Sequence, residues 1–274
     1  MQYSNRFKSK FKATYGPWAL VTGASSGIGE ALSRHLATIG MNIVLSGRNK
    51  EKLLALSDSL EEDHEIITEI VVADISSAPE IYRVVDEVKH IPLGLFVASA
   101  GFGTSGDFKN ADLKQEIQML NVNGLALMML THYFARRFSE QGRGGIILMS
   151  SIVGFLGVPN AAHYGATKAY VQSLGEGLYH ELKPFGVDVL AAAPGPVNSG
   201  FGTVANMKMG NTMTPNEVAP AILNALGKRH TVFPGFLTKV LVSGLRTVPR
   251  WGKIRIMKKV MGGMTKHQKA TAKL

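Results

Sequence analysis

The sequence predicts a single doubly wound α/β domain of the Rossmann type, with a parallel sheet and a basic amphipathic C-terminal extension. Two observations predict it. Apolar runs alternate with amphipathic stretches along most of the 274 residues, which is the βαβ rhythm of a sheet covered on both faces. A glycine-rich segment also follows the first apolar run directly and opens a helical stretch, which is typical of the first turn of such folds.

Each predicted strand is a short apolar run bounded by turn residues or by a helical stretch. We expect strands at residues 18–22, 42–46, 66–73, 93–99, 145–150 and 187–193. Helices are expected at residues 28–39 and 50–60, and longer ones around 115–140 and 164–183. The connections between parallel strands should be right-handed crossovers.

Charge divides the chain into three parts. The net charge is +10, but residues 1–29 and 228–274 hold four and twelve basic residues and no acid. We therefore expect a basic tail over residues 1–13, a domain over 14–235 and a basic extension over 236–274. A disordered tail is the favoured interpretation of the first segment.

Composition also sets the expected class of protein. The absence of cysteine excludes disulfides and thiolate metal sites, and no pair of histidines has ligand spacing beside a third ligand, so we expect no metal. No apolar run reaches the ~18 residues of a spanning helix, and no secretory signal is visible. We expect a cytoplasmic protein, with a peripheral place at a membrane surface as an alternative.

The glycine-rich segment at residues 22–29 (TGASSGIG) predicts a dinucleotide site. Its glycines allow a tight turn close to a pyrophosphate, and the helix N-terminus offers free N–H groups. The expected contacts are Gly23, Ser25, Ser26, Gly27, Ile28 and Gly29. Arg48 stands nineteen positions after Gly29, where NAD-binding folds place an acid, so NADP(H) is favoured. A glycine-rich turn without a ligand is the alternative.

Tyr164 and Lys168 are four residues apart in a helical stretch, and this spacing puts them on one face. A nearby ammonium stabilises a phenolate and should lower the pKa of the tyrosine toward the range useful for proton transfer. Ser151 ends a predicted strand thirteen residues earlier, at the edge of the sheet where ligands bind. These three residues therefore predict an acid–base site.

The residues named so far stand in an order that resembles the classical short-chain dehydrogenase/reductase family. The matching parts are residues 22–29, Asp74, Asn121, Ser151, Tyr164, Lys168 and Pro194 with Gly195. The resemblance implies that Asp74 contacts the adenine, that Asn121 holds a relay water and that Lys168 also holds the nicotinamide ribose. It places Ala100, Gly101, Pro194, Gly195, Val197 and Ser199 along the cofactor. One departure is Ser99, where the family usually has asparagine.

Two segments of the chain predict the substrate and the surface contacts: residues 196–214, which we call the substrate segment, and the C-terminal extension. Residues 196–214 hold one charge, Lys208, so a hydrophobic carbonyl or alcohol of acyl, steroid-like or other lipid-like type is expected. The C-terminal extension mixes apolar and basic residues, which is typical of an interfacial helix or of an apolar lid with a solvated outer face. Pro234 and Pro249 should interrupt any helix in this part of the chain. The resemblance suggests a homodimer or homotetramer.

Two other functions stay open. The fold alone would also serve an NADP(H)-binding sensor, although a pure binder needs no Ser151, Tyr164 and Lys168 together. In a membrane-surface scaffold, the C-terminal extension would be the functional part. We expect no specific nucleic-acid binding, because basic clusters without a reading module bind only non-specifically.

Overall fold

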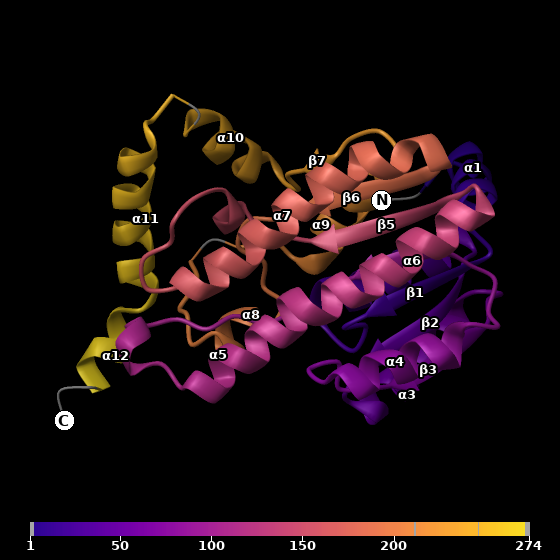
Figure 1. Ribbon diagram of the computed structural model, residues 1–274, viewed down its shortest axis with the longest axis horizontal. Helices are drawn as coiled ribbons and strands as arrows, with labels where there is room; N and C mark the ends of the chain where they lie inside the picture. Colours follow the sequence, from indigo (N-terminus) through magenta and orange to yellow (C-terminus); the bar gives the residue numbers. More distant parts are fainter. Residues whose placement is uncertain (1–2, 211, 246, 272–274) are drawn as a thin grey trace.

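A single seven-stranded sheet forms the centre of the molecule, and every neighbouring pair of strands in it is parallel (Figure 1). The computed structural model describes residues 3–210, 212–245 and 247–271. The predicted tails and substrate segment also include residues 1–2, 211, 246 and 272–274, which lie outside the described residues. The strand order is β3-β2-β1-β4-β5-β6-β7. The strands are β1 (Trp18–Thr22), β2 (Asn42–Gly47), β3 (Thr68–Val72), β4 (Leu93–Ala98), β5 (Gly144–Met149), β6 (Val187–Ala192) and β7 (Thr231–Val232).

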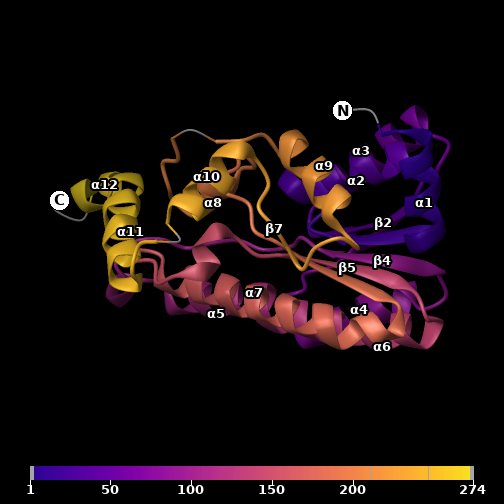
Figure 2. The same ribbon diagram turned by 90° about the horizontal axis from the view of Figure 1, so that it is seen from above.

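Helices cover both faces of this sheet (Figure 2). On one face lie α1 (Asn5–Tyr15), α2 (Gly27–Ile39), α3 (Lys50–Asp63) and α9 (Pro215–Ala225). On the other lie α4 (Ala78–Val88), α5 (Leu113–Leu120), α6 (Leu127–Gln141) and α7 (Ala162–Leu182). Short elements complete the chain: the 3-10 helices η1 (Phe108–Asn110), η3 (Ile152–Phe155) and η4 (Lys183–Phe185), the π-helix η2 (Asn121–Ala126), α8 (Phe201–Val204), α10 (Phe236–Gly244), α11 (Arg250–Met264) and α12 (Lys266–Thr271).

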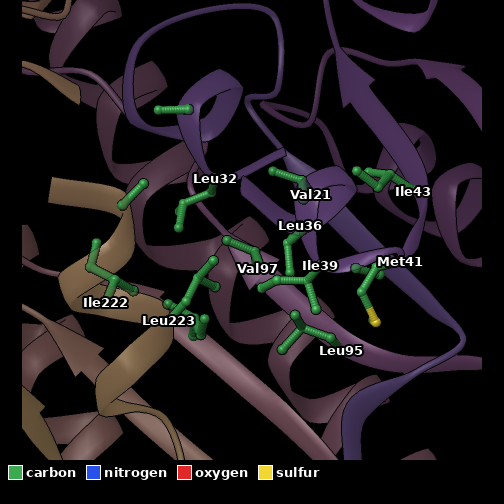
Figure 3. Packing of buried hydrophobic residues seen from close by; sticks show 14 of the residues in the cluster. Val21, Leu32, Leu36, Ile39, Met41, Ile43, Leu95, Val97, Ile222 and Leu223 are labelled. Atoms are coloured by element: carbon green, nitrogen blue, oxygen red, sulfur yellow. The ribbon is translucent and has the colours of Figure 1, made fainter. Parts of the chain in front are cut away.

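The core explains why the strands read as continuous apolar runs. Every residue of β1, β4 and β5 is buried, since helices cover the sheet from both sides. Figure 3 shows Leu36 of α2 beside Val21 and Val97 of the strands, and Ile222 and Leu223 of α9 belong to the same buried cluster. The predicted fold class is confirmed, and the predicted strands fall within two residues of the observed ones.

The strand order reverses between β1 and β4, and this reversal positions the site. Chain connections leave β1 and β4 toward opposite sides, which opens a crevice beyond the carboxyl ends of the two strands. The segments that follow β1, β4, β5 and β6 all start at this edge. They carry the glycine-rich turn, Ala100 and Gly101, Ser151, and Pro194 with Gly195.

The first segment differs from its prediction. Residues 3–13 are not a disordered tail, because α1 packs against the core through Phe11 and Tyr15, which are buried. The Tyr15 hydroxyl donates a 2.7 Å hydrogen bond to Asp188 at the base of β6. The signal in the sequence was an aromatic residue at every fourth position (Tyr3, Phe7, Phe11 and Tyr15), which the strong basic charge of the segment obscured.

Beyond β7 the chain forms α10, α11 and α12 at one end of the molecule (Figures 1 and 2). The two prolines act as expected, since α10 begins after Pro234 and Pro249 is the N-cap of α11. Among the described residues, no helix combines the length and the apolar character that crossing a membrane requires.

Candidate active site

The turn between β1 and α2 is built around glycines that cannot be replaced without strain. Gly23 and Gly27 have φ values of 69° and 61°, in the left-handed region. A Cβ on Gly29 would lie 2.2 Å from the Gly23 carbonyl oxygen. The N-cap residue of α2, Ser26, makes no side-chain capping bond, so the first-turn N–H groups face the crevice beyond β1. This turn therefore has the form that accepts a phosphate at a helix N-terminus.

Three other segments close on this turn. A Cβ on Gly23 would lie 2.7 Å from Ala100 Cα, and one on Gly27 would lie 2.9 Å from Ser199 Cβ. A Cβ on Gly101 would lie 3.5 Å from Lys168 Nζ. The residues that the sequence assigned to a cofactor, although up to 176 positions apart, thus line one continuous edge. Val197, Pro194 and Gly195 extend it after β6.

Arg48 and Asp74 lie at the ends of two neighbouring strands. Arg48 follows β2 and is exposed. Asp74 follows β3, is half-buried, and accepts a 3.1 Å hydrogen bond from the Ser76 amide. Because β2 and β3 are adjacent and parallel, both residues stand at the same edge of the sheet as the glycine turn. Ser25 also lies near this point, against Gly47.

Tyr164 is buried in the first turn of α7, and its side chain is hydrogen-bonded to Ser151. Ser151 comes two residues after the end of β5 and is the N-cap of η3, where its hydroxyl accepts a 3.4 Å hydrogen bond from the Val153 amide. The same hydroxyl lies 3.5 Å from the Pro194 carbonyl. The strand end and the helix thus bring two hydroxyl groups together at the crevice.

Lys168 lies one turn further along α7 and is also buried. Its Nζ donates a 2.7 Å hydrogen bond to the Met149 carbonyl and lies 5.9 Å from the centre of the Tyr164 ring. Burial lowers the pKa of Lys168 to about 8, so the amine is still mostly protonated at pH 7.

One electrostatic expectation is wrong for the chain by itself. The sequence predicted a lowered pKa for Tyr164, but burial raises it, against the opposing hydrogen bond with Ser151. The physical reason is desolvation, which disfavours phenolate in a site walled by apolar side chains. The phenol is therefore protonated at neutral pH.

The two asparagines of the Asn-Val-Asn sequence occupy different places. Asn121 is half-buried and begins η2, a turn type that is rare and found often at functional sites. Asn123 is fully buried; its amide donates 2.8 Å and 3.1 Å hydrogen bonds to the Phe102 carbonyl and to Thr167, and its oxygen accepts from the Phe102 amide. Asn123 thus fixes the segment after β4 to α7, a role that the sequence analysis missed because it depends on contacts with Phe102 and Thr167, which are distant in the sequence.

An apolar collar surrounds Tyr164. Phe201 of α8 packs on its ring with the centroids 5.1 Å apart. The other members come from five segments of the chain, and those with buried or partly buried side chains include Phe102, Met119, Val158, Ala161, Met207, Met257, Met261 and Met264. The collar is rich in methionine, whose flexible thioether adapts to irregular ligands. Of the apolar residues that follow Ser151 closely in the sequence, Val158 belongs to this buried cluster, and Phe155 and Leu156 do not.

The C-terminal helices hold part of this collar in place. Met257, Met261 and Met264 share one face of α11, since they are three and four residues apart. The Lys208 amide donates a 2.9 Å hydrogen bond to the Met264 carbonyl, and the Gln268 amide group bonds Ser105 and the Asn206 carbonyl. The apolar side of the extension thus belongs to the same buried cluster as Tyr164.

Glu116 and His163 form a pair beside the site that the sequence did not single out. Glu116 of α5 is buried, and its carboxylate contacts His163 Nδ1 directly before Tyr164. The pair ties α5 to the first turn of α7. No cluster of metal-ligating side chains occurs in the part of the chain that the structure describes.

Comparison with known proteins gives a consistent result. The family described as short chain dehydrogenase matches residues 17–209. The 7beta-hydroxysteroid dehydrogenase of Mediterraneibacter gnavus is 29% identical over 235 residues, which are 83% of this chain and 89% of that protein. A solved structure of a 7beta-hydroxysteroid dehydrogenase has a TM-score of 0.83 at 28% identity and covers 90% of this chain and 98% of its own. A short-chain dehydrogenase from Sphingobium yanoikuyae in complex with NADPH has a TM-score of 0.77 at 28% identity, over 85% and 98% of the two chains.

Proposed function

This chain belongs to the short-chain dehydrogenase/reductase family of oxidoreductases, and on that premise we propose that it is an NADP(H)-dependent enzyme for a bulky apolar ketone or the matching alcohol. The observation that carries the proposal is the hydrogen-bonded pair of Tyr164 and Ser151, which stands under an apolar collar with the Lys168 ammonium one turn away. This arrangement offers a proton donor to the bound substrate, and the side chains that the structure describes in the collar are apolar. Small acidic or sugar-like substrates would lose their hydration there without compensation.

The residues along the crevice fit a dinucleotide. In this proposal the first-turn N–H groups of α2, with Gly23, Ser25, Ser26, Gly27, Ile28 and Gly29, hold the pyrophosphate. Asp74 lies toward the adenine, and Ala100, Gly101, Pro194, Gly195, Val197 and Ser199 lie along the path to Tyr164. The close contacts that a Cβ at Gly23 or Gly29 would make support this assignment, because a tight turn here leaves backbone amides directed outward.

Arg48 supports NADP(H) over NAD(H). Its guanidinium is exposed beyond β2, where a 2′-phosphate on the adenine ribose would accept paired hydrogen bonds. The Sphingobium protein that resembles this chain was solved with NADPH. The cofactor, when bound, supplies the hydride that the protein's own side chains cannot provide.

The side chains account for the proton. Tyr164 is the general acid, and its protonated state at neutral pH is the one that reduction of a carbonyl requires. Ser151 donates a second hydrogen bond to the same substrate oxygen. Lys168 places its charge behind the phenol and favours loss of the Tyr164 proton as negative charge moves to the tyrosine oxygen. Asn121, at the start of η2, holds the water that returns a proton from solvent.

The collar supports a large apolar substrate. Tyr164 is only 8% exposed, Phe201 packs on its ring and the α11 methionines belong to the same buried cluster, so a substrate must displace these side chains or slide between them. Contact with the apolar surface of the collar would stabilise a substrate with a flat or elongated hydrocarbon body through the hydrophobic effect. The Mediterraneibacter relative is a 7beta-hydroxysteroid dehydrogenase, and a steroid is a hydrocarbon body of this kind.

Oxidation of NADPH against a panel of ketones tests the proposal. We expect turnover with steroid ketones, long-chain 3-oxoacyl thioesters or aromatic ketones, and at least 100-fold lower kcat/KM with small polar ketones. Met261→Asp should weaken binding of the best substrate and leave NADPH binding unchanged. Turnover confined to small polar ketones would overturn the substrate class. Tight NADPH binding with no turnover in a broad panel would favour the sensor instead.

A further inference from the structure

We propose that the outer face of α11, continued by α10, binds an anionic membrane surface. This face consists of exposed side chains of α11, whereas the three methionines of the helix are buried or partly buried. Its exposed apolar residues are Trp251, Ile256 and Val260, which are 63%, 43% and 42% exposed. Its exposed basic residues are Arg255, Lys258 and Lys259. We call these six residues the basic face.

The basic face combines the two features that interfacial binding needs. An aromatic and two aliphatic side chains can enter the boundary between headgroups and acyl chains, while the cations beside them meet lipid phosphates. Arg255 lies over the ring of Trp251 at 5.0 Å, so the charge and the indole form one unit. Indole rings with one wet edge are favoured at the membrane boundary.

Charge complementarity identifies the surface that it fits. Residues 228–274 contain no acid, so neither helix offers the basic face a carboxylate of its own. Among the residues whose side chains the structure describes, no ion pair involves a lysine or arginine of α10 or α11. The middle of the chain, residues 30–227, carries a net charge of −6. This separation orients the basic end toward a negative surface.

α10 adds a second apolar element at the same end of the molecule (Figures 1 and 2). Phe236 is 83% exposed, and Val240 and Leu241 are 47% and 44% exposed beside the exposed Lys239. Large side chains this exposed and this close in the sequence are unusual on a surface that faces only water. Two amphipathic helices that follow one another in the chain can lie on a bilayer together.

The position of the basic face has a consequence for the proposed activity. The inner side of α11 lines the collar over Tyr164, so the same helix separates the site from the membrane. An apolar substrate dissolved in the bilayer would then reach the collar without crossing water. This last step rests on the proposed function; the binding to lipid does not, and it is tested without substrate.

Trp251 supplies an internal probe for the test. The only other tryptophan, Trp18, is buried in β1. Full-length protein is mixed with vesicles of phosphatidylcholine, alone or with 30 mol% phosphatidylglycerol, and binding is followed by sedimentation and by tryptophan emission. We expect sedimentation and a blue shift with the anionic vesicles, neither with the neutral ones, and no blue shift from Trp251→Phe.

Matched triple variants distinguish this surface from general basicity. Changing Arg255, Lys258 and Lys259 to glutamine should weaken partition roughly 100-fold, at about fivefold per charge. Changing Lys10, Lys50 and Lys52, which are exposed on α1 and α3 at the other end, should have little effect. Circular dichroism and NADPH binding show that each variant is folded.

Several outcomes would overturn the proposal. Absence of sedimentation with anionic vesicles at low salt would do so, as would equal losses in the two triple variants. Equal affinity for duplex DNA, without a blue shift from vesicles, would identify a general polyanion surface. A change from oligomer to monomer in Trp251→Gln would instead make the basic face a contact between two copies of the chain.

Discussion

Replacing Lys168 by methionine should abolish activity and yet stabilise the protein without cofactor. The Lys168 ammonium is buried with the Met149 carbonyl as a hydrogen-bond partner, and no carboxylate offsets its charge among the contacts that define its pKa. Methionine has a similar length and no charge. The variant therefore removes the cost of burying a cation while it largely fills the same space.

The magnitude follows from the pKa of Lys168, which burial lowers from 10.5 to about 8. At 1.36 kcal/mol for each pKa unit, the charged amine costs the folded state about 3 kcal/mol at pH 7. Against this, the Met149 carbonyl loses its partner, which costs ~1–3 kcal/mol. We expect a net gain of about 1 kcal/mol in the free energy of unfolding at pH 7.

The pH dependence has a definite sign. Because the folded pKa lies below the unfolded one, the wild-type unfolded state binds more protons between pH 8 and 10.5, and wild-type stability rises through that window. The penalty should fall by about 2 kcal/mol between pH 7 and 9.5, so the advantage of the variant should vanish or reverse there.

Urea unfolding of the nucleotide-free wild type and Lys168→Met at pH 7, 8.5 and 9.5 measures this difference. A variant less stable than wild type by more than ~1 kcal/mol at pH 7 would refute the reasoning, because the lost hydrogen bond would then outweigh the buried charge. A difference that is constant across the pH range would refute it as well.

Three further changes test separate parts of the structure. Arg48→Ala should weaken NADPH binding about 10- to 100-fold and leave NADH binding unchanged, since a charge-assisted contact is worth ~1.5–3 kcal/mol. Equal losses of affinity for the two nucleotides in fluorescence titrations would contradict the assignment of Arg48 to the 2′-phosphate. Phe11→Ala should cost ~3–5 kcal/mol in urea unfolding because Phe11 is buried, whereas Phe185→Ala, at an exposed site, should change little; similar values for both would show that α1 does not support the core. Ile117→Lys should produce monomers in light scattering if the exposed apolar residues Leu113, Ile117 and Leu120 of α5 join two subunits, and a monomeric wild type would exclude that interface.

The sheet and the residues at its edge could be predicted because their signals are local. Each strand is a short apolar run between turn residues. The glycine-rich segment predicts a tight turn between a strand and a helix, because glycine can adopt the positive φ values that this turn requires. Ser151 could be placed at the crevice from its position after a strand alone, because the carboxyl ends of parallel strands meet at that edge of the sheet. The helical spacing of Tyr164 and Lys168 likewise needed no tertiary information.

The features that the sequence analysis missed depend on contacts between distant segments. The pKa of Tyr164 is set by burial under Phe201 and the α11 methionines, and neither segment is near it in the sequence. Asn123 gains its role from Phe102 and Thr167, which lie on other elements. The helix at residues 5–15 had a four-residue aromatic period, but its basic charge was given more weight than that period.

Hydride transfer by Tyr164→Phe tests the central claim most directly. Phenylalanine keeps the ring that packs on Phe201 and removes only the hydroxyl that is hydrogen-bonded to Ser151. Wild type and variant are compared in single turnover with NADPH and the best ketone of the panel, with NADPH affinity measured separately by fluorescence. We predict unchanged NADPH affinity and a rate of reduction at least 100-fold lower, since a positioned acid contributes ~10²–10⁴. A variant that binds NADPH normally and reduces the ketone at the wild-type rate would contradict the assignment of Tyr164 as the acid.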